Sequence, residues 1–239
     1  MARNRPTADG LATERPGTWR EMAVARSLDP ARARAEERVQ RFLDAAVELM
    51  QSDSGKDFTV QDVVERSGQS LRSFYQYFAG KHELLLALFE DAVRVTAEQL
   101  EEAIAGVDDP LERLHVFVVE HYLVCRPAPK SGPAKKRGPS PTAMAEFGQR
   151  LLTEHPKEAS RAFVPVVSLF ERLLDDAAAA GAIRPQLSHR SIAGVALQAI
   201  MFNAFAATIS GTPLRPDGRE DAEELWTIFI HGIGTGDSA

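Results

Sequence analysis

The segment from residue 59 to residue 81 constrains the fold of this chain more than any other part of it. It reads TVQDVVERSGQSLRSFYQYFAGK. Thr59, with an Asp three positions later, is typical of a helix start, where a side-chain oxygen accepts a bond from a free backbone amide. Gly68 supplies the left-handed backbone that a tight turn between helices needs, and Ser70 can cap a second short helix over 71–78. Two short helices around such a turn are the pattern of a helix-turn-helix.

The second of these short helices has two faces of different chemistry. Phe74 and Phe78 lie four residues apart, a spacing that places both on one face and predicts that they belong to the core. Two roles are open for Tyr75, simple packing or a polar contact through its hydroxyl. We favour the polar contact, because a tyrosine hydroxyl needs a hydrogen-bond partner. The major groove of DNA is about 12 Å wide and accepts one helix with a hydrogen-bonding face. The remaining side chains offer such a face: Arg72, Ser73, Tyr75, Gln76 and Tyr77.

The rest of the chain predicts helices and no strands, so the expected fold class is all-α. Apolar residues recur at the three-to-four spacing of a helix, and no alternation typical of strands stands out. We expect an extension that lacks regular structure over 1–30, a three-helix DNA-binding domain over 31–82 and a helical domain over 83–235. The helices expected in the last domain cover 81–103, 110–125, 142–155, 157–180, 188–210 and 217–233.

Composition narrows the function classes. The net charge is −6, but residues 1–82 carry 13 Lys and Arg against 12 Asp and Glu, so the excess of acidic residues lies beyond residue 82. Nucleic-acid binding needs a local positive surface rather than a basic whole, so this division permits DNA contact. Cys125 is the single cysteine, which excludes an internal disulfide and predicts a reducing, cytoplasmic location.

Three segments leave alternatives open. Residues 1–30 are either a mobile tail, which we favour, or a basic arm that reaches a minor groove. Residues 126–140 contain four Lys and Arg after Arg126 and no acidic residue, which fits a solvated loop better than a nucleic-acid patch. Residues 191–214 carry no charge, and a buried helix is favoured over a membrane span because polar and small residues interrupt the stretch.

At this point the sequence resembles the TetR family of repressors. The residues that carry the resemblance lie within 38–90 and are Gly68, Ser70, Phe74-Tyr75-Gln76-Tyr77-Phe78, Gly80-Lys81 and Leu84-Leu85. The resemblance implies that Thr59, Tyr75, Tyr77 and Lys81 contact phosphates, which fixes register without reading sequence. It implies that Ser70, Leu71, Arg72, Ser73 and Gln76 face base edges, with Arg72 suited to guanine. Three departures are Gln69 in place of an apolar residue, Val64 in place of alanine, and Gly80 in place of a polar cap. The first implies either a less buried turn or a contact of Gln69 with DNA.

The resemblance also implies a homodimer with a pocket for a small-molecule effector. The uncharged helix near 188–210 needs cover on both faces, and pairing with its twin and with the last helix, through Leu225, Trp226, Ile228 and Phe229, would provide it. Candidate ligand-binding residues form an apolar set with a few polar groups, although core packing is the alternative for each of them. They are Phe117, His121, Tyr122, Cys125, Phe147, Leu151, Phe163, Val167, Phe170 and Phe202.

No motif for catalysis, a cofactor or a metal site is apparent. His115, His121 and Cys125 lie close along one helix but lack further ligands at useful spacing, so we expect no metal and no cofactor. We therefore expect a regulator that binds a palindromic double-stranded DNA operator as a homodimer and is released by a hydrophobic or amphipathic ligand. Activation in place of repression remains open. The alternative class is an all-α small-molecule binding protein or enzyme whose helix-turn-helix is vestigial.

Overall fold

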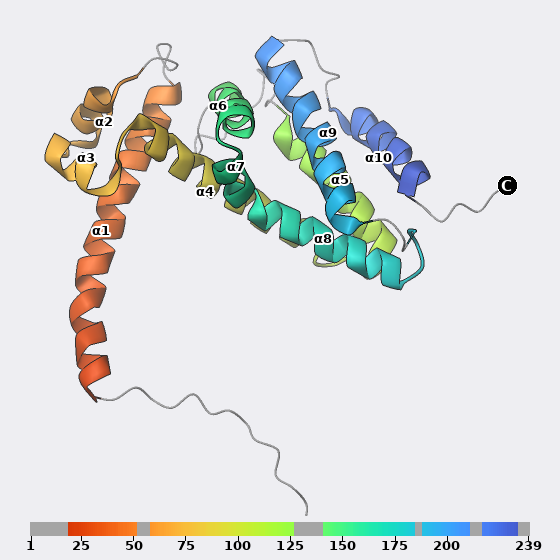
Figure 1. Cartoon of the computed structure of the whole chain (residues 1–239), viewed down its shortest axis with the longest axis horizontal. Helices are drawn as coiled ribbons and strands as arrows, with labels where there is room; N and C mark the ends of the chain where they lie inside the picture. The colour runs from red at the N-terminus through yellow and green to blue at the C-terminus, as the bar shows by residue number, and fades with distance from the viewer. Residues whose placement is uncertain (1–18, 52–57, 127–140, 185–187, 211–216, 234–239) are drawn as a thin grey trace, which may run out of the picture. The chain divides into compact units, whose positions relative to one another are not determined.

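The computed structural model describes residues 19–51, 58–126, 141–184, 188–210 and 217–233, and these residues form ten helices. The all-α expectation is confirmed for this part of the chain (Figure 1). The helices are α1 (Trp19–Gln51), α2 (Val60–Ser67), α3 (Leu71–Tyr77), α4 (Lys81–Ile104), α5 (Pro110–Cys125), α6 (Pro141–Glu154), α7 (Pro156–Ala162), α8 (Val164–Ala179), α9 (His189–Ser210) and α10 (Arg219–Ile233).

The first helix begins earlier than the sequence predicted. The expectation of no regular structure over residues 1–30 is wrong from Trp19 onward, because α1 runs through Pro30 without ending there. Proline removes one intrahelical hydrogen bond, and the Arg34 guanidinium donates to the Pro30 carbonyl at 2.9 Å. Residues 1–18 lie outside the described part of the chain.

The chain divides into two compact units within α1, residues 1–41 and 42–239. In the first unit, two exposed ion pairs join side chains one helical turn apart: Arg32–Glu36 at 2.8 Å and Arg41–Glu37 at 2.6 Å. A pair at this spacing stabilises a helix by about 0.2–0.5 kcal/mol. The boundary that the sequence predicted, near residue 82, remains a prediction.

Three aromatic rings connect α1 to the second short helix. The Phe42 and Phe74 centroids lie 5.4 Å apart, and those of Phe74 and Phe78 lie equally close. Phe42 and Phe74 are fully buried and Phe78 nearly so. The predicted core role of Phe74 and Phe78 is therefore confirmed, although Phe78 follows the last residue of α3 rather than belonging to the helix.

The core of the larger unit lies among α4, α5, α8, α9 and α10. Helix α5 contacts α4, α8, α9 and α10, and the ring of Phe117 on α5 stacks on Phe170 of α8 with centroids 4.6 Å apart. The helix expected over 157–180 is instead two helices, α7 and α8, because Pro165 in the first turn of α8 favours a new helix start at Phe163. Gly181 ends α8 with φ +76°, as the turn there requires.

Helix α9 has one covered and one open face within a single chain. Six side chains of its covered face are buried: Ile192, Ala193, Ala196, Leu197, Ile200 and Met201. On the other face Val195 is 70% and Phe202 69% exposed. Among the described residues, no helix combines the length and the apolar character that crossing a membrane requires.

Candidate nucleic-acid interface and effector cavity

The two short helices, α2 and α3, are each capped at the N-terminus by a side-chain hydrogen bond. The Thr59 hydroxyl accepts from the Asp62 amide at 3.2 Å, and the Asp62 carboxylate accepts from the Thr59 amide at 2.6 Å. This reciprocal arrangement is a capping box, so the start of α2 predicted from the sequence is confirmed. The hydrogen bonds from the backbone and the hydroxyl of Thr59 lower the pKa of Asp62, so its carboxylate stays charged at the helix start.

The turn between α2 and α3 has the geometry that the sequence required. Gly68 adopts φ +64°, and its amide and that of Gln69 bond back to carbonyls of the last turn of α2. Ser70 then caps α3, because its hydroxyl accepts from the Ser73 amide at 3.1 Å. These bonds fix the direction in which α3 leaves the turn.

One face of α3 is open to solvent while the opposite face is anchored in the core. The Leu71 side chain is 43% and that of Tyr75 57% exposed, and Arg72 and Gln76 are exposed as well. In the part of the chain that the structure describes, Arg72 has no ion pair. Ser73 and Tyr77 are half-buried at the edges of this face, and Gln69 is half-buried in the turn. The structure therefore places Ser70, Leu71, Arg72, Tyr75 and Gln76 on one accessible surface, which we call the α3 face.

Lys81, the first residue of α4, contacts the protein. Its ammonium donates to the Phe58 carbonyl at 2.5 Å and lies over the Phe58 ring, 4.1 Å from the centroid. The lysine thereby joins the start of α4 to the segment that precedes α2. Its phosphate contact remains a prediction, as do those of Thr59, Tyr75 and Tyr77.

A large open cavity lies along α9, against α6, α7 and α8. Its volume is about 1180 Å³, slightly above the range of about 300–1000 Å³ typical of small-molecule sites. Polar and charged groups line it as well as apolar ones: Gln149, Ser160, Ser168, Glu171, Arg190 and Gln198 among the former, and Leu152, Phe163, Val164, Val167, Val195 and Phe202 among the latter. We call it the α9 groove.

The structure brings only three of the ten predicted ligand-binding residues to this groove, namely Phe163, Val167 and Phe202. Phe117 and Phe170 are fully buried against each other. Phe147 and Leu151 are buried on α6, and Phe147 contacts the ring of Phe89 at 5.9 Å. For these four residues, core packing is what the structure shows.

His121, Tyr122 and Cys125 lie on the inner side of α5. His121 is 3% exposed, its ring contacts Phe117, and its Nδ1 has no hydrogen-bond partner within the described residues. Burial lowers the pKa of His121 to about 4, so the ring is neutral. Burial raises the pKa of the Cys125 thiol to about 12, so that this thiol is neither a nucleophile nor a metal-binding thiolate at neutral pH.

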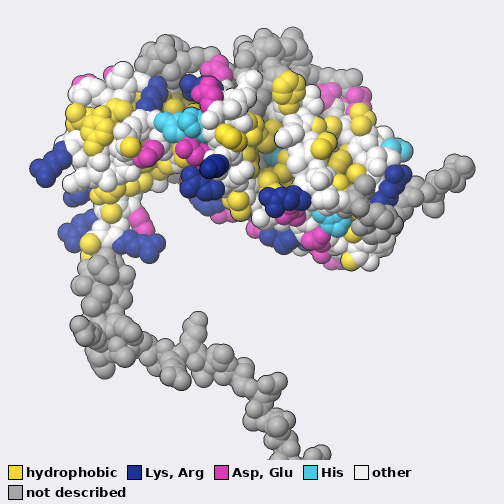
Figure 2. Space-filling view, in the orientation of Figure 1, with side chains coloured by type: hydrophobic (Ala, Val, Ile, Leu, Met, Phe, Trp, Pro, Cys, Tyr) yellow, Lys and Arg dark blue, Asp and Glu magenta, His cyan; other side chains and the backbone are white. Residues whose placement is uncertain are grey.

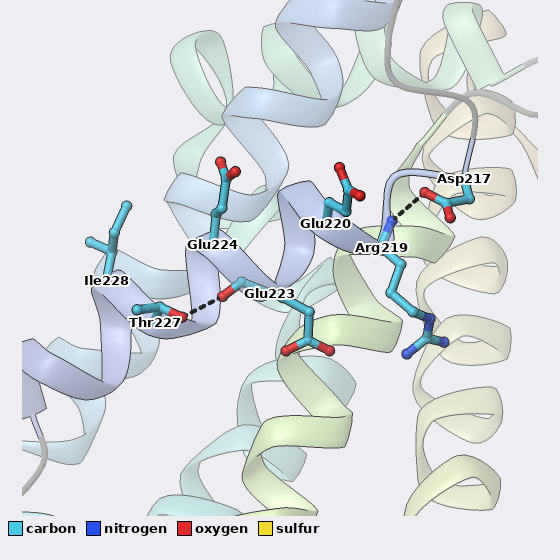
Figure 3. Close-up of a pocket in the computed structure, with 7 residues that line it drawn as sticks. All are labelled: Asp217, Arg219, Glu220, Glu223, Glu224, Thr227 and Ile228. Carbon is cyan, nitrogen blue, oxygen red and sulfur yellow. Dashed lines mark hydrogen bonds between the residues drawn. The ribbon is translucent and has the colours of Figure 1, made fainter.

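A second hollow, of about 710 Å³, lies over α10 and is markedly acidic (Figure 3). Four acidic residues, Asp217, Glu220, Glu223 and Glu224, line it together with Arg219. The Arg219 guanidinium also pairs with Glu120 on α5 at 2.9 Å. This hollow offers an anion little attraction, so the α9 groove is the better candidate for an amphipathic or anionic effector.

Sequence reasoning missed most of the groove lining, including Arg190, Val195 and Gln198. Of the groove residues on α9, Arg190, Gly194 and Gln198 follow one another at intervals of four, a helical spacing that was present in the sequence. The sequence could not show that α6, α7 and α8 leave this face uncovered.

Comparison with known proteins places the short helices in one family. Residues 42–88 match the model described as "Bacterial regulatory proteins, tetR family". An HTH-type transcriptional regulator of Bacillus subtilis, YvdT, is 29% identical over 86 residues, which are 36% of this chain and 44% of that protein. The fatty acid metabolism regulator protein of the same organism is 26% identical over 82 residues, 34% of this chain and 42% of the relative. The chain thus spans less than half the length of the curated relatives it matches.

Solved structures share the fold over most of the chain. The regulator FadR from Bacillus subtilis in complex with stearoyl-CoA has a TM-score of 0.62 at 17% identity and covers 81% of this chain and 98% of its own. The Thermus thermophilus repressor FadR in complex with lauroyl-CoA has a TM-score of 0.62 at 18% identity and covers 84% and 97%. At such identity the likeness concerns the fold. The segment over residues 42–88, which holds the two short helices, is therefore similar to the TetR family of bacterial regulatory proteins.

Proposed function

We propose that this protein is a ligand-responsive transcriptional repressor that binds a palindromic operator as a homodimer and is released by an amphipathic ligand. The observation that carries the proposal is the α3 face. A short helix fixed by buried Phe74 presents exposed Arg72, Tyr75 and Gln76 to solvent. A helix with this division of faces suits the major groove, where Arg pairs with guanine and Gln with adenine.

Dimerisation is supported by apolar side chains that a single chain leaves exposed on α9 and α10. Val195, Phe202 and Ile228 are each about 70% exposed. Pairing α9 and α10 with their twins would remove these side chains from water in a four-helix arrangement. A twofold dimer also presents two copies of α3, as a palindromic operator requires.

The chemistry of the α9 groove supports an effector with a long apolar part and an anionic head. Leu152, Phe163 and Val167 offer apolar surface, while Arg190 offers a guanidinium for a carboxylate or phosphate. Two solved structures of the same fold contain acyl-CoA thioesters. We therefore propose long-chain acyl-CoA as the effector class.

Helix α4 is the proposed route from groove to DNA. It begins at Lys81, directly after the α3 segment, and contacts α5, α6, α7 and α8. A ligand that favours one position of these helices would shift α4 and change the separation of the two α3 helices. Coupling of this kind is typically worth about 1–3 kcal/mol.

The test is fluorescence anisotropy with labelled DNA from upstream of the protein's own gene, over a series of salt concentrations. The proposal expects salt-sensitive binding above that to a scrambled duplex, two chains per site, and release by lauroyl- or stearoyl-CoA but not by free CoA. Equal binding to both duplexes at every salt concentration would favour the rival class, a small-molecule binding protein or enzyme with a vestigial helix-turn-helix.

A further inference from the structure

Two histidines and one glutamate converge where the start of α4 meets α7. His82 is the second residue of α4, His155 directly precedes α7, and Glu158 lies in the first turn of α7. His82 and Glu158 are 76 residues apart in the sequence. Only the tertiary structure therefore brings them together, and the three residues form no pattern in the sequence that would predict a metal site.

Nitrogen and oxygen atoms of the three side chains lie close to one another. His82 Nε2 lies 2.7 Å from Glu158 Oε2, and His155 Nδ1 lies 3.9 Å from the same oxygen. The two imidazole rings lie with centroids 4.5 Å apart, and Phe147 covers the His82 ring from one side at 5.7 Å. One ligand atom from each residue fits within 4.8 Å of the other two. In Figure 2 histidine side chains gather on the surface with acidic side chains beside them.

The electrostatics of the cluster favour a cation. The Glu158 carboxylate lies within hydrogen-bond distance of His82 and close to His155. Neutral imidazole and carboxylate are the nitrogen and oxygen ligands that Zn²⁺ prefers.

We propose that His82, His155 and Glu158 form a binding site for a divalent transition-metal ion such as Zn²⁺. Three atoms within 4.8 Å of one another share a point within roughly 2.8 Å of all three, so shifts of under about 1 Å bring them to Zn–N and Zn–O distances of about 2.0–2.2 Å. Three protein ligands leave the fourth tetrahedral position for water.

The bound ion would join the two structural elements that supply its ligands. His82 directly follows Lys81, which contacts the segment before α2, whereas His155 and Glu158 belong to the α6–α7 corner. An ion ligated by all three fixes the start of α4 against α7. Because the ion binds only where both elements are folded together, it raises the melting temperature of the chain. This consequence does not depend on the proposed DNA binding.

The test is Co²⁺ titration of the full-length protein without an affinity tag, followed in the visible spectrum and by thermal unfolding. Wild type is expected to bind one Co²⁺ per chain, with ligand-field absorption that added Zn²⁺ removes, and to melt at a higher temperature with either ion. The double variant His82→Gln/His155→Gln should weaken Co²⁺ binding at least tenfold and abolish the rise in melting temperature. The same is expected of Glu158→Gln.

The matched control is His115→Gln. His115 also pairs with two carboxylates, Glu223 at 2.7 Å and Glu112 at 3.4 Å, but through opposite ring nitrogens, so the three cannot converge on one ion. This variant should bind Co²⁺ as wild type does. If wild type binds no more Co²⁺ than the double variant, or if His115→Gln removes the signal equally, the cluster is a hydrogen-bonded ion pair only and the proposal is wrong.

Discussion

The ring of Phe42 on α1 meets the ring of Phe74 on α3 edge to face, with centroids 5.4 Å apart and planes at 86°. Both side chains are 0% exposed. This contact fixes α3 against the long first helix, and it leaves Arg72, Tyr75 and Gln76 on the opposite side. The accessible surface of α3 therefore depends on a buried aromatic pair.

Replacing Phe74 with alanine is expected to destabilise the protein by roughly 3–5 kcal/mol, because a fully buried aromatic side chain is lost and a cavity remains. Urea unfolding followed by circular dichroism measures the change. Gln76→Ala on the exposed side of the same helix should change the free energy of unfolding by less than about 0.5 kcal/mol. Similar effects of the two variants would contradict the assigned faces.

Gly68→Ala is expected to cost about 1–2 kcal/mol of stability, because Gly68 adopts φ +64° and a side chain is strained there. No atom lies within 4 Å of the added Cβ, so the cost comes from the backbone alone. Gly106 is the matched control, since it also has open space but lies outside the left-handed region. Gly106→Ala should be neutral or stabilising by up to about 1 kcal/mol, and a loss equal to that of Gly68→Ala would overturn the explanation.

Two substitutions on the α3 face are expected to separate base reading from phosphate contact. Arg72→Ala should reduce the preference for operator over scrambled DNA, since a bidentate pair with guanine is worth about 1–3 kcal/mol. Tyr75→Phe should weaken binding to both duplexes by a similar factor, near tenfold. Anisotropy titrations measure both effects. The control is Arg66→Ala. Arg66 is an exposed residue of α2 that pairs with Glu48 of α1, and this variant should bind both duplexes as wild type does.

Ile228→Glu is expected to favour the monomer, because it places a charge on an α10 side chain that is 73% exposed in one chain and buried in the proposed dimer. Sedimentation velocity at micromolar concentration should show at least a tenfold rise in the dimer dissociation constant. Val124→Glu introduces the same charge at an exposed position of α5 and should leave the dimer intact. A wild-type chain that sediments as a monomer would contradict the dimer proposal itself.

The free energy of unfolding is expected to decrease as the pH is lowered, because His121 is buried in its neutral form. Its pKa of about 4 in the folded chain lies below the ordinary histidine value of 6.5, so between these two pH values the unfolded chain binds a proton that the folded chain excludes. Stability from this group is complete above pH 6.5 and declines toward pH 4, by about 3 kcal/mol in all. His121→Leu should show a smaller decline, measured by urea unfolding from pH 7 to pH 4. Parallel pH profiles for the two proteins would refute the assignment.

The sequence predicted the local structure of the DNA-binding segment because its signals are local. Thr59, Gly68 and Ser70 act within a few residues of themselves, through a cap or a backbone conformation, and the spacing of Phe74 and Phe78 alone indicated their common face. The start of α1 was missed because proline at position 30 resembles a boundary, although a helix can pass it. The break at Phe163 was missed because the apolar period continues across it.

Only the tertiary structure showed which residues line the α9 groove and which side chains form the histidine cluster. Phe117 and Phe163 are both apolar aromatic residues in helices, yet one is buried against Phe170 and the other lines the α9 groove. His82 and His155 are far apart in sequence and lie 4.5 Å apart as rings. By itself the sequence determined which residues favour helix, turn or core, since those preferences act between near neighbours. The packing of helices that are distant in the chain decided which polar groups meet and which apolar faces stay open.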